Sequence, residues 1–538
     1  MPLRTTLLLG LLGLAGLSVA QAASGFGAPV TDEPAPVPSQ TGGRPSPPLD
    51  SVDPVARLAE RLAAGELQLE YVDWWGYLPS LLEALDVPLS SQALVFSRTS
   101  LQTDRIAPWA PRALYFNDDV YIGWVQDSPI IEIGAVDPVD GARFYTLAQT
   151  EVESPRFQVE TTTCLMCHES RSITEGVPGF MVRSILVDRM GYPIDEIHRG
   201  PTTDRTPFER RWGGWYVTGT HGAERHSGNV YSPAMSHEVD QKRRYIDAFD
   251  FTPGANVGSL EDRFDTDAYL TPHSDLVSIL VLAHQARIHN LIALARTETL
   301  AALRLQELTA PAPEDVDGDG LLPTTRVRIT GPVERLLQTM LFVRAAPLEG
   351  PVRGTSSFAQ DFEARGPWDG EGRSLRELDL DSRLFRYPMS FLVHSDAFAA
   401  LPPVVKQLFA RRLIEVLSGE DTSDAFAHLE VADREGILTI LLAGLAWAGP
   451  AWAQALDVTV PETETACLEA GGRWDRGGLA GQLLCFLPTP DAGKACTTAE
   501  DCSGFCLAET GTCSAETPLF GCFAIRDLDG AEVTLCID

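Results

Sequence analysis

Residues 93–147 carry five short runs rich in β-forming side chains: ALVFS (93–97), RALYF (112–116), VYIGWV (120–125), IIEIGAV (130–136) and RFYTL (143–147). Turn-forming residues separate the later runs, with Asn-Asp, Asp-Ser-Pro and Asp-Gly in the gaps. Short β-rich runs with such turns between them are typical of antiparallel strands that follow one another in space. This part of the chain therefore predicts an antiparallel meander.

Helical patterns lie on both sides of these runs, so we expect an α+β fold. Val55–Ala64 has its apolar residues at helical spacing and ends at Gly65. A long apolar helix is expected after Ser274, which we interpret as its N-cap, and this helix should extend to Thr297. Further helices are expected at 332–345, 404–417 and 434–446.

The composition restricts the classes of function. The chain has 538 residues, with 74 acidic and 42 basic side chains and a formal net charge of −32. A phosphate backbone or an anionic membrane surface would repel such a protein. A nucleic-acid-binding function is therefore not expected.

The first 22 residues have the features of a secretory signal peptide. An arginine precedes an apolar run of about 13 residues, too short for a membrane span, and Ala20-Gln21-Ala22 forms a small-residue cleavage site. Residues 23–50 are rich in proline, glycine and serine, which predicts a disordered leader. We expect an exported protein, periplasmic or extracellular, with no membrane span after signal cleavage.

The ten cysteines fall into two groups. Eight lie in the last 72 residues, and only Cys164 and Cys167 lie in the middle of the chain. In an exported protein, eight clustered cysteines predict four disulfides in a small module, here 461–538, with 105 pairings open. A zinc ribbon is the alternative, although this segment contains no histidine.

The middle pair belongs to the motif Cys164-Leu165-Met166-Cys167-His168. Cys-x-x-Cys-His is the attachment signal of c-type haem: two thiols add to the vinyl groups, and the histidine binds the iron as proximal ligand. We therefore expect covalent haem c on Cys164 and Cys167, with His168 as iron ligand. A thioredoxin-like redox pair, a zinc site and a structural disulfide remain alternatives.

The CLMCH box and its neighbours resemble a known group of proteins. The segments ITEGVPGFMVRSILVDRMGYPI (173–194) and FERRWGGWYVTGTHGAERHSGN (208–229) follow the box. Together they resemble the large exported bacterial c-type cytochrome-domain proteins, over about 93–419. The resemblance implies covalent haem and electron transfer, and it does not imply a substrate.

The sixth iron ligand is open at this level. We consider four candidates in the segments after the box: His226, His221, Met190 and Met181. An iron with an open distal face is the alternative. His284 and His289 are expected to be core histidines, because a spacing of five places them about 140° apart around a helix. Two arginines are candidate partners for a haem propionate: Arg183 and Arg225.

Three function classes follow from these residues. The first is a mono-haem c-type cytochrome that transfers single electrons to a redox partner with a basic surface. The second is a peroxidase-like oxidoreductase with His226 and Arg225 on the distal side of the iron. The third is a surface or binding protein whose cysteine-rich tail recognises a partner. The sequence does not indicate an oligomeric state.

The expected domains are the signal peptide (1–22), the leader (23–50), a haem-bearing domain (51–460) and the cysteine-rich module (461–538). Within the haem-bearing domain we place the haem site at about 160–260 and the helical part at about 272–450. A calcium ion at Asp315, Asp317 and Asp319 is a further hypothesis, because these alternating aspartates resemble the start of a calcium loop. Arg326 stands at the twelfth position of that loop, which normally holds a glutamate.

Overall fold

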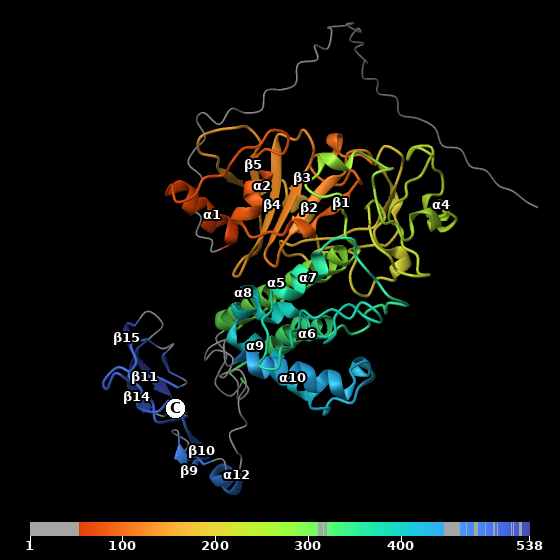
Figure 1. The fold of residues 1–538 in the computed structure, drawn as a ribbon. Coiled ribbons are helices and arrows are strands. Elements are labelled where there is room, and N and C mark those ends of the chain that lie inside the picture. Colours follow the sequence, from red (N-terminus) through yellow and green to blue (C-terminus); the bar gives the residue numbers. More distant parts are fainter. Residues whose placement is uncertain are drawn as a thin grey trace, which may run out of the picture. The chain divides into compact units, whose positions relative to one another are not determined.

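The structure of the chain is a computed structural model (Figure 1). The structure describes two long segments and a set of shorter ones toward the C-terminus. They are 53–309, 316, 320–445, 463–469, 471–477, 482–489, 491–498, 501, 502, 504–517, 519, 521–526 and 530–537. The expected signal peptide, the leader and the three aspartates of the calcium hypothesis lie outside these residues.

The predicted meander is confirmed as a six-stranded antiparallel sheet in which every strand pairs with its neighbour in sequence. A sixth strand that the sequence did not indicate extends it. The strands are β1 (Ala93–Val95), β2 (Arg112–Phe116), β3 (Val120–Trp124), β4 (Ile130–Asp137), β5 (Gly141–Ala148) and β6 (Phe157–Val159).

The two faces of this sheet have different roles. One face presents Tyr115, Ile122 and Ile133, which pack with α1 (Pro54–Ala63) and α2 (Leu78–Ala84) in one apolar core. The opposite face contributes to a second core together with the long helix α5 (Leu276–Thr309). The period of two along a strand thus divides the side chains between two cores.

The helical part follows a long loop region. This region contains α3 (Leu165–His168), the hairpin β7 (Ile185–Val187) and β8 (Pro193–Glu196), and α4 (Lys242–Asp247). The later helices share one apolar core with α5; the first four contact α5, and the last packs against the helix before it (Figure 1). They are α6 (Pro323–Met340), α7 (Phe358–Ala364), α8 (Asp396–Ala399), α9 (Pro403–Leu417) and α10 (Val431–Leu445).

The predicted limits of two helices are wrong. Helix α5 continues beyond Thr297 to Thr309, because the added residues are mostly good helix formers and Thr299 and Ala302 stay buried. Helix α6 starts at Pro323, nine residues before the expected start at Pro332. Pro332 lies inside this helix, whose buried face includes Ile329 and Val333 on either side of it.

The predicted cap of α5 is also wrong. Ser274 accepts a hydrogen bond from the Leu94 N–H (2.8 Å) and donates one to the Tyr216 carbonyl (2.7 Å), so it joins the sheet to the loop region. The capping group is the buried carboxylate of Asp275. Its Oδ1 accepts from Val277 N–H (2.8 Å) and Ser278 N–H (3.2 Å), as an N-cap does.

The other carboxylate oxygen of Asp275 holds a distant segment. Oδ2 accepts from Thr355 N–H, Ser356 N–H and the Ser356 hydroxyl, each at 2.8 Å. Gly354 makes this approach feasible, because a Cβ there would lie 2.2 Å from the carboxylate. One side chain therefore fixes the start of α5 and residues 354–356 together.

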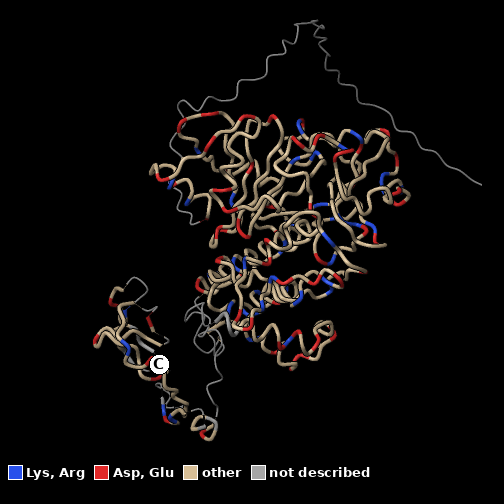
Figure 2. Tube along the Cα trace, in the orientation of Figure 1, with Lys and Arg blue, Asp and Glu red and all other residues tan. Residues whose placement is uncertain are grey.

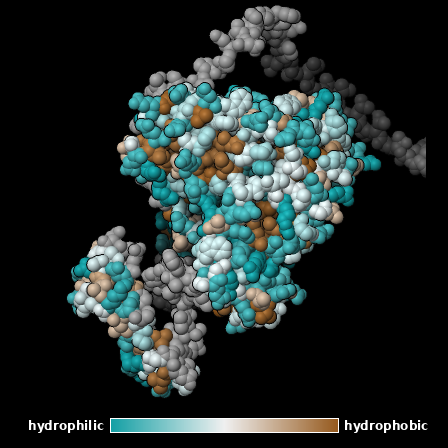
Figure 3. All heavy atoms as spheres, in the orientation of Figure 1, coloured by the Kyte–Doolittle hydropathy of each residue, from teal (hydrophilic) through white to brown (hydrophobic). Residues whose placement is uncertain are grey.

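Helix α5 is also long and apolar enough to cross a membrane by length and composition, the only described helix of this kind. Of its most apolar window, 89% is buried inside the protein. The core helix of a soluble protein has the same features, so this helix is weak evidence for a membrane span. Figure 3 shows a mostly hydrophilic face with scattered apolar patches.

The cysteine-rich module consists of short antiparallel strands and one helix. Three disulfides join Cys467 to Cys485, Cys496 to Cys506, and Cys502 to Cys513. Cys522 and Cys536 face each other in the backbone register of β14 and β15. The elements are α12 (Glu464–Glu469), β9 (Arg473–Gly477), β10 (Gln482–Pro488), β11 (Cys506–Leu507), β12 (Thr512–Cys513), β13 (Glu516–Thr517), β14 (Gly521–Arg526) and β15 (Glu532–Ile537).

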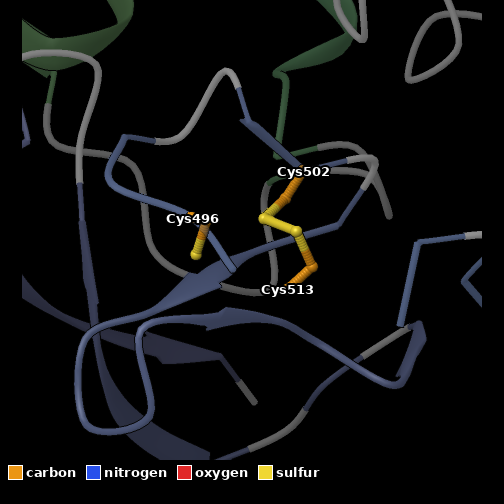
Figure 4. A group of neighbouring side chains, drawn as sticks. All are labelled: Cys496, Cys502 and Cys513. Carbon is orange, nitrogen blue, oxygen red and sulfur yellow. A yellow bond between two sulfur atoms is a disulfide. The ribbon is translucent and has the colours of Figure 1, made fainter. Parts of the chain in front are cut away.

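The sulfurs of Cys496, Cys502 and Cys513 lie within 4.8 Å of one another, the only such group of potential metal ligands in the described residues. Figure 4 shows Cys502 and Cys513 joined by a disulfide, and Cys496 is bonded to Cys506. Disulfide sulfurs are not thiolates, which are the form that binds zinc. In this structure the three sulfurs are therefore a disulfide cluster and not a zinc ribbon.

Candidate functional site

The Cys-x-x-Cys-His motif forms a single helical turn. The Cys164 carbonyl accepts hydrogen bonds from the N–H groups of Cys167 (3.2 Å) and His168 (3.0 Å). Both thiols are free, with Cys164 half-buried and Cys167 exposed. Burial raises the pKa of the Cys164 thiol to about 11, so this thiol is protonated at neutral pH. The turn therefore presents two reduced thiols and an imidazole from one short segment.

The imidazole of His168 is held by the backbone of a later loop. Its Nδ1 donates to the Gly179 carbonyl (2.8 Å), and the Gly179 N–H donates to the His168 carbonyl (2.9 Å). Burial lowers the pKa of His168, which favours the neutral ring. Nε2 has no hydrogen-bond partner in the described part of the chain. Histidines that bind metals typically have a neutral ring that is fixed by a hydrogen bond from Nδ1, so that the lone pair of Nε2 is available to the metal.

Helix α5 fixes this loop in turn. The Asn290 amide accepts from Phe180 N–H (2.9 Å) and donates to the Phe180 carbonyl (2.8 Å). Gly179 lies against the same amide, since a Cβ there would be 2.2 Å from Asn290 Oδ1. The ring orientation of His168 is therefore set by a chain of contacts that runs from α5 through Phe180 and Gly179.

A cavity that opens to solvent lies beside the motif and holds about 1060 Å³ of empty space, its mouth included. Cys164, Cys167 and His168 line it together with residues of the sheet, the loops and α5. The other lining residues used below are Arg112, Leu114, Tyr121, Gly123, Glu132, Gly134, Phe144, Phe180, Met181, Val182, Trp215, Leu282 and Ala286.

Two glycines shape the sheet side of this cavity. Arg112 on β2 reaches Glu132 on β4 (2.6 Å) across Gly123 of β3, where a Cβ would lie 2.3 Å from the guanidinium. At Gly134 a Cβ would lie 2.7 Å from the Phe180 ring. The missing side chains thus let an ion pair and an aromatic ring lie flat against the sheet.

Aromatic rings form much of the wall. Phe144 lies 4.6 Å from the His168 ring between centroids, and Tyr121 stacks on Phe180 at 4.1 Å. Trp215 also lines the cavity, with its indole N–H bonded to the Arg183 carbonyl (2.8 Å). A flat apolar cofactor attached through the two thiols would find aromatic neighbours here.

The four candidates for the sixth ligand are distributed unequally. Met181 lines the same cavity as the motif, whereas Met190, His221 and His226 are not among its lining residues. His221 and His226 form a buried pair with ring centroids 4.8 Å apart. Nδ1 of His226 accepts from Gly228 N–H and Nε2 of His221 from Asn256 N–H, both at 3.0 Å. Burial lowers the pKa of His226 to about 3.

The other residues singled out from the sequence make ordinary structural contacts. His284 bonds to Asp204 and Ser390, both at 2.8 Å, and His289 donates from Nε2 to the Asp118 carbonyl (2.8 Å), as expected of core histidines. Arg183 forms an ion pair with Glu196. Arg225 is exposed and does not line the cavity.

Several residues of this site were not found from the sequence, namely Arg112, Gly123, Glu132, Gly134 and Gly179. A signal for four of them was present, because alternation places Arg112, Gly123, Glu132 and Gly134 on the sheet face opposite the core with α1 and α2. Glycine inside a strand often marks the close approach of another group. Gly179 carried no comparable signal.

Comparison with known proteins gives no relative: no family model matches the chain, and no curated protein or solved structure is similar to it.

Proposed function

We propose that this chain is an exported mono-haem c-type cytochrome that transfers single electrons. The observation that carries the proposal is the position of Cys164, Cys167 and His168 on one helical turn at the wall of an open cavity. The tie between His168 Nδ1 and Gly179, with Nε2 free, supports the assignment of His168 as the iron ligand.

The residues would act as follows. Cys164 and Cys167 would hold the haem through thioether bonds, each thiol adding across one vinyl double bond while its proton passes to the other vinyl carbon. Bound haem supplies a one-electron iron couple. The Gly179 carbonyl orients the His168 ring, and Phe144, Tyr121 and Phe180 exclude water from the wall. The Arg112–Glu132 pair keeps opposite charges beside the site.

Met181 supports electron transfer over a peroxidase-like function, because it is the candidate sixth ligand that shares the cavity with His168. A methionine on the sixth position closes the iron to small molecules and raises its potential. The distal pair proposed for a peroxidase, His226 and Arg225, does not line this cavity. We therefore assign Met181 as the sixth ligand.

The optical spectrum of the exported protein tests both assignments. We expect one covalent haem per chain by pyridine haemochrome, a low-spin spectrum and no response to carbon monoxide. Met181→Ala should gain carbon monoxide binding, while Met190→Ala, the matched control, should not. A high-spin wild-type spectrum that shifts with peroxide would contradict electron transfer and favour the enzyme.

The charge of the chain determines the kind of partner that we propose. Acidic positions outnumber basic ones along the trace (Figure 2), in keeping with the net charge of −32. A redox partner with a basic surface would be attracted, and added salt would screen the attraction. We expect the rate of electron exchange with a basic cytochrome to fall at least several-fold between about 10 and 300 mM salt. A stopped-flow rate that does not change would refute this expectation.

A further inference from the structure

A second cavity, separate from the one beside the motif, is lined by arginines. It holds about 710 Å³ of empty space, its mouth included. None of its lining residues lines the cavity of Cys164, Cys167 and His168. The polar lining residues used below are Ser172, Glu175, Arg199, Thr203, Asp204, Arg205 and Arg287.

Positive charge is concentrated here in a protein that is otherwise strongly acidic. Arg199, Arg205 and Arg287 line the cavity, and Arg335 and Arg344 lie close enough to repel Arg205. Burial and then the neighbouring guanidinium of Arg287 lower the pKa of Arg205. The carboxylates of Glu175 and Asp204 in the same lining offset part of this repulsion, and Asp204 raises the pKa of Arg205.

The two carboxylates of the cavity are already engaged. Glu175 accepts from both Arg287 (2.8 Å) and Arg335 (2.7 Å). Asp204 accepts from Nδ1 of His284 (2.8 Å). Neither acid forms an ion pair with Arg199 or Arg205 in the described part of the chain.

Two arginines therefore keep donors for a ligand. The Arg205 Nε donates to the Val343 carbonyl (3.0 Å), and its two terminal nitrogens make no hydrogen bond to the described residues. The Arg199 side chain has no ion-pair or hydrogen-bond partner there either. The hydroxyls of Ser172 and Thr203 lie in the same lining and can add neutral donors.

From these contacts we propose that the arginine cavity binds a small soluble oxyanion, of the class of phosphate or a short dicarboxylate. A guanidinium presents its N–H groups in a planar fork that matches two oxygens of such an anion. Arg205 and Arg199 supply the free forks, and Arg287 supplies charge from the side of α5. The proposal does not depend on haem attachment.

The site is connected to the candidate haem site through two segments. Ser172 and Glu175 belong to the loop that follows α3, and Arg287 comes directly after Ala286, which lines the other cavity. Haem carboxylates are therefore the second source of the same chemistry, and the experiment must distinguish a soluble anion from them.

Calorimetric titration with inorganic phosphate at constant ionic strength tests the proposal on the mature exported protein. We expect saturable binding that weakens about tenfold in Arg205→Gln, since hydrogen bonds to charged groups have energies of this order. Arg304→Gln is the matched control: it removes an exposed arginine from the same helix as Arg287, far from the cavity lining, and should leave the affinity unchanged.

Thermal melting of each variant checks that folding is intact, which the exposure of Arg205 favours. An affinity that is the same in wild type and Arg205→Gln would overturn the site, as would the absence of phosphate binding. Binding that appears only in Cys164→Ala/Cys167→Ala, which lacks covalent haem, would assign the arginines to haem carboxylates and overturn the soluble ligand. Equal binding with and without haem would support it.

Discussion

Replacing both Cys164 and Cys167 with alanine is expected to abolish covalent haem completely. The thioether bonds need two sulfurs, and the structure places both thiols in reduced form at the cavity wall. Alanine removes the sulfur without adding a polar group beside the half-buried Cys164. The measurement is the pyridine haemochrome of the variant after export in a cell with the haem-attachment machinery.

Met166→Ala provides the matched control, because Met166 lies between the two cysteines and is 78% exposed. We expect this variant to keep a full complement of haem. Far-UV circular dichroism on both variants separates loss of haem from loss of fold. Covalent haem in the double variant, or none in the wild type, would remove the basis of the proposed function and leave a redox or zinc pair to be considered.

A second large effect is expected from Asp275→Ala, which should lower the free energy of unfolding by about 3–5 kcal/mol. The buried carboxylate accepts hydrogen bonds from five donors, two at the start of α5 and three from Thr355 and Ser356. Alanine leaves these donors buried without an acceptor, and water has little access because Asp275 is 1% exposed. Urea unfolding of the wild type and the variant measures the loss.

Asp265→Ala is a suitable comparison. Asp265 also caps a helical turn, but its bond to Asp267 N–H is exposed to solvent. The loss there should stay near 1 kcal/mol or below. Similar losses in the two variants would mean that the contacts to residues 354–356 contribute little and that Asp275 acts only as a local cap.

The fold class and the meander could be predicted because their signals are local. Turn residues such as Asn117-Asp118 and Asp140-Gly141 mark where strands end, and alternation along β4 and β5 follows from the pleat. The sixth strand has no such alternation, because it is only three residues long and none of its residues is fully buried.

Helix limits were harder to predict, since they depend on tertiary contacts. Serine and aspartate are both common N-caps, so the sequence does not distinguish Ser274 from Asp275. Ser274 does not cap the helix because its hydroxyl bonds to the backbone of Leu94 and Tyr216. The apolar pattern predicts a helix that begins at Pro332, a residue type that is common in the first turn of helices. Packing of Ile329 and Val333 carries α6 across it.

The Cys-x-x-Cys-His motif of the candidate site lies within five residues and can be read from the sequence, whereas the rest of the site cannot. The wall brings together residues as far apart as Arg112 and Ala286, and no local pattern joins them. His221 and His226 lie in one loop and were candidate ligands. In the structure they contact Phe208 and Trp212 and do not line the cavity of the motif. Met181 could be preferred over the other candidate ligands only because the loop around Gly179 places it in the same cavity as His168.

The division of the sheet into two faces has a consequence for protein engineering. Tyr115, Ile122 and Ile133 belong to the core with α1 and α2, so substitutions on that face cost stability. Leu114 borders the cavity instead, and Gly123 and Gly134 leave no room for a side chain, because a Cβ there would lie 2.3 Å from Arg112 or 2.7 Å from Phe180. We therefore expect redesign of the cavity to be tolerated at Leu114 and excluded at the two glycines, while the core with α1 and α2 is left unchanged.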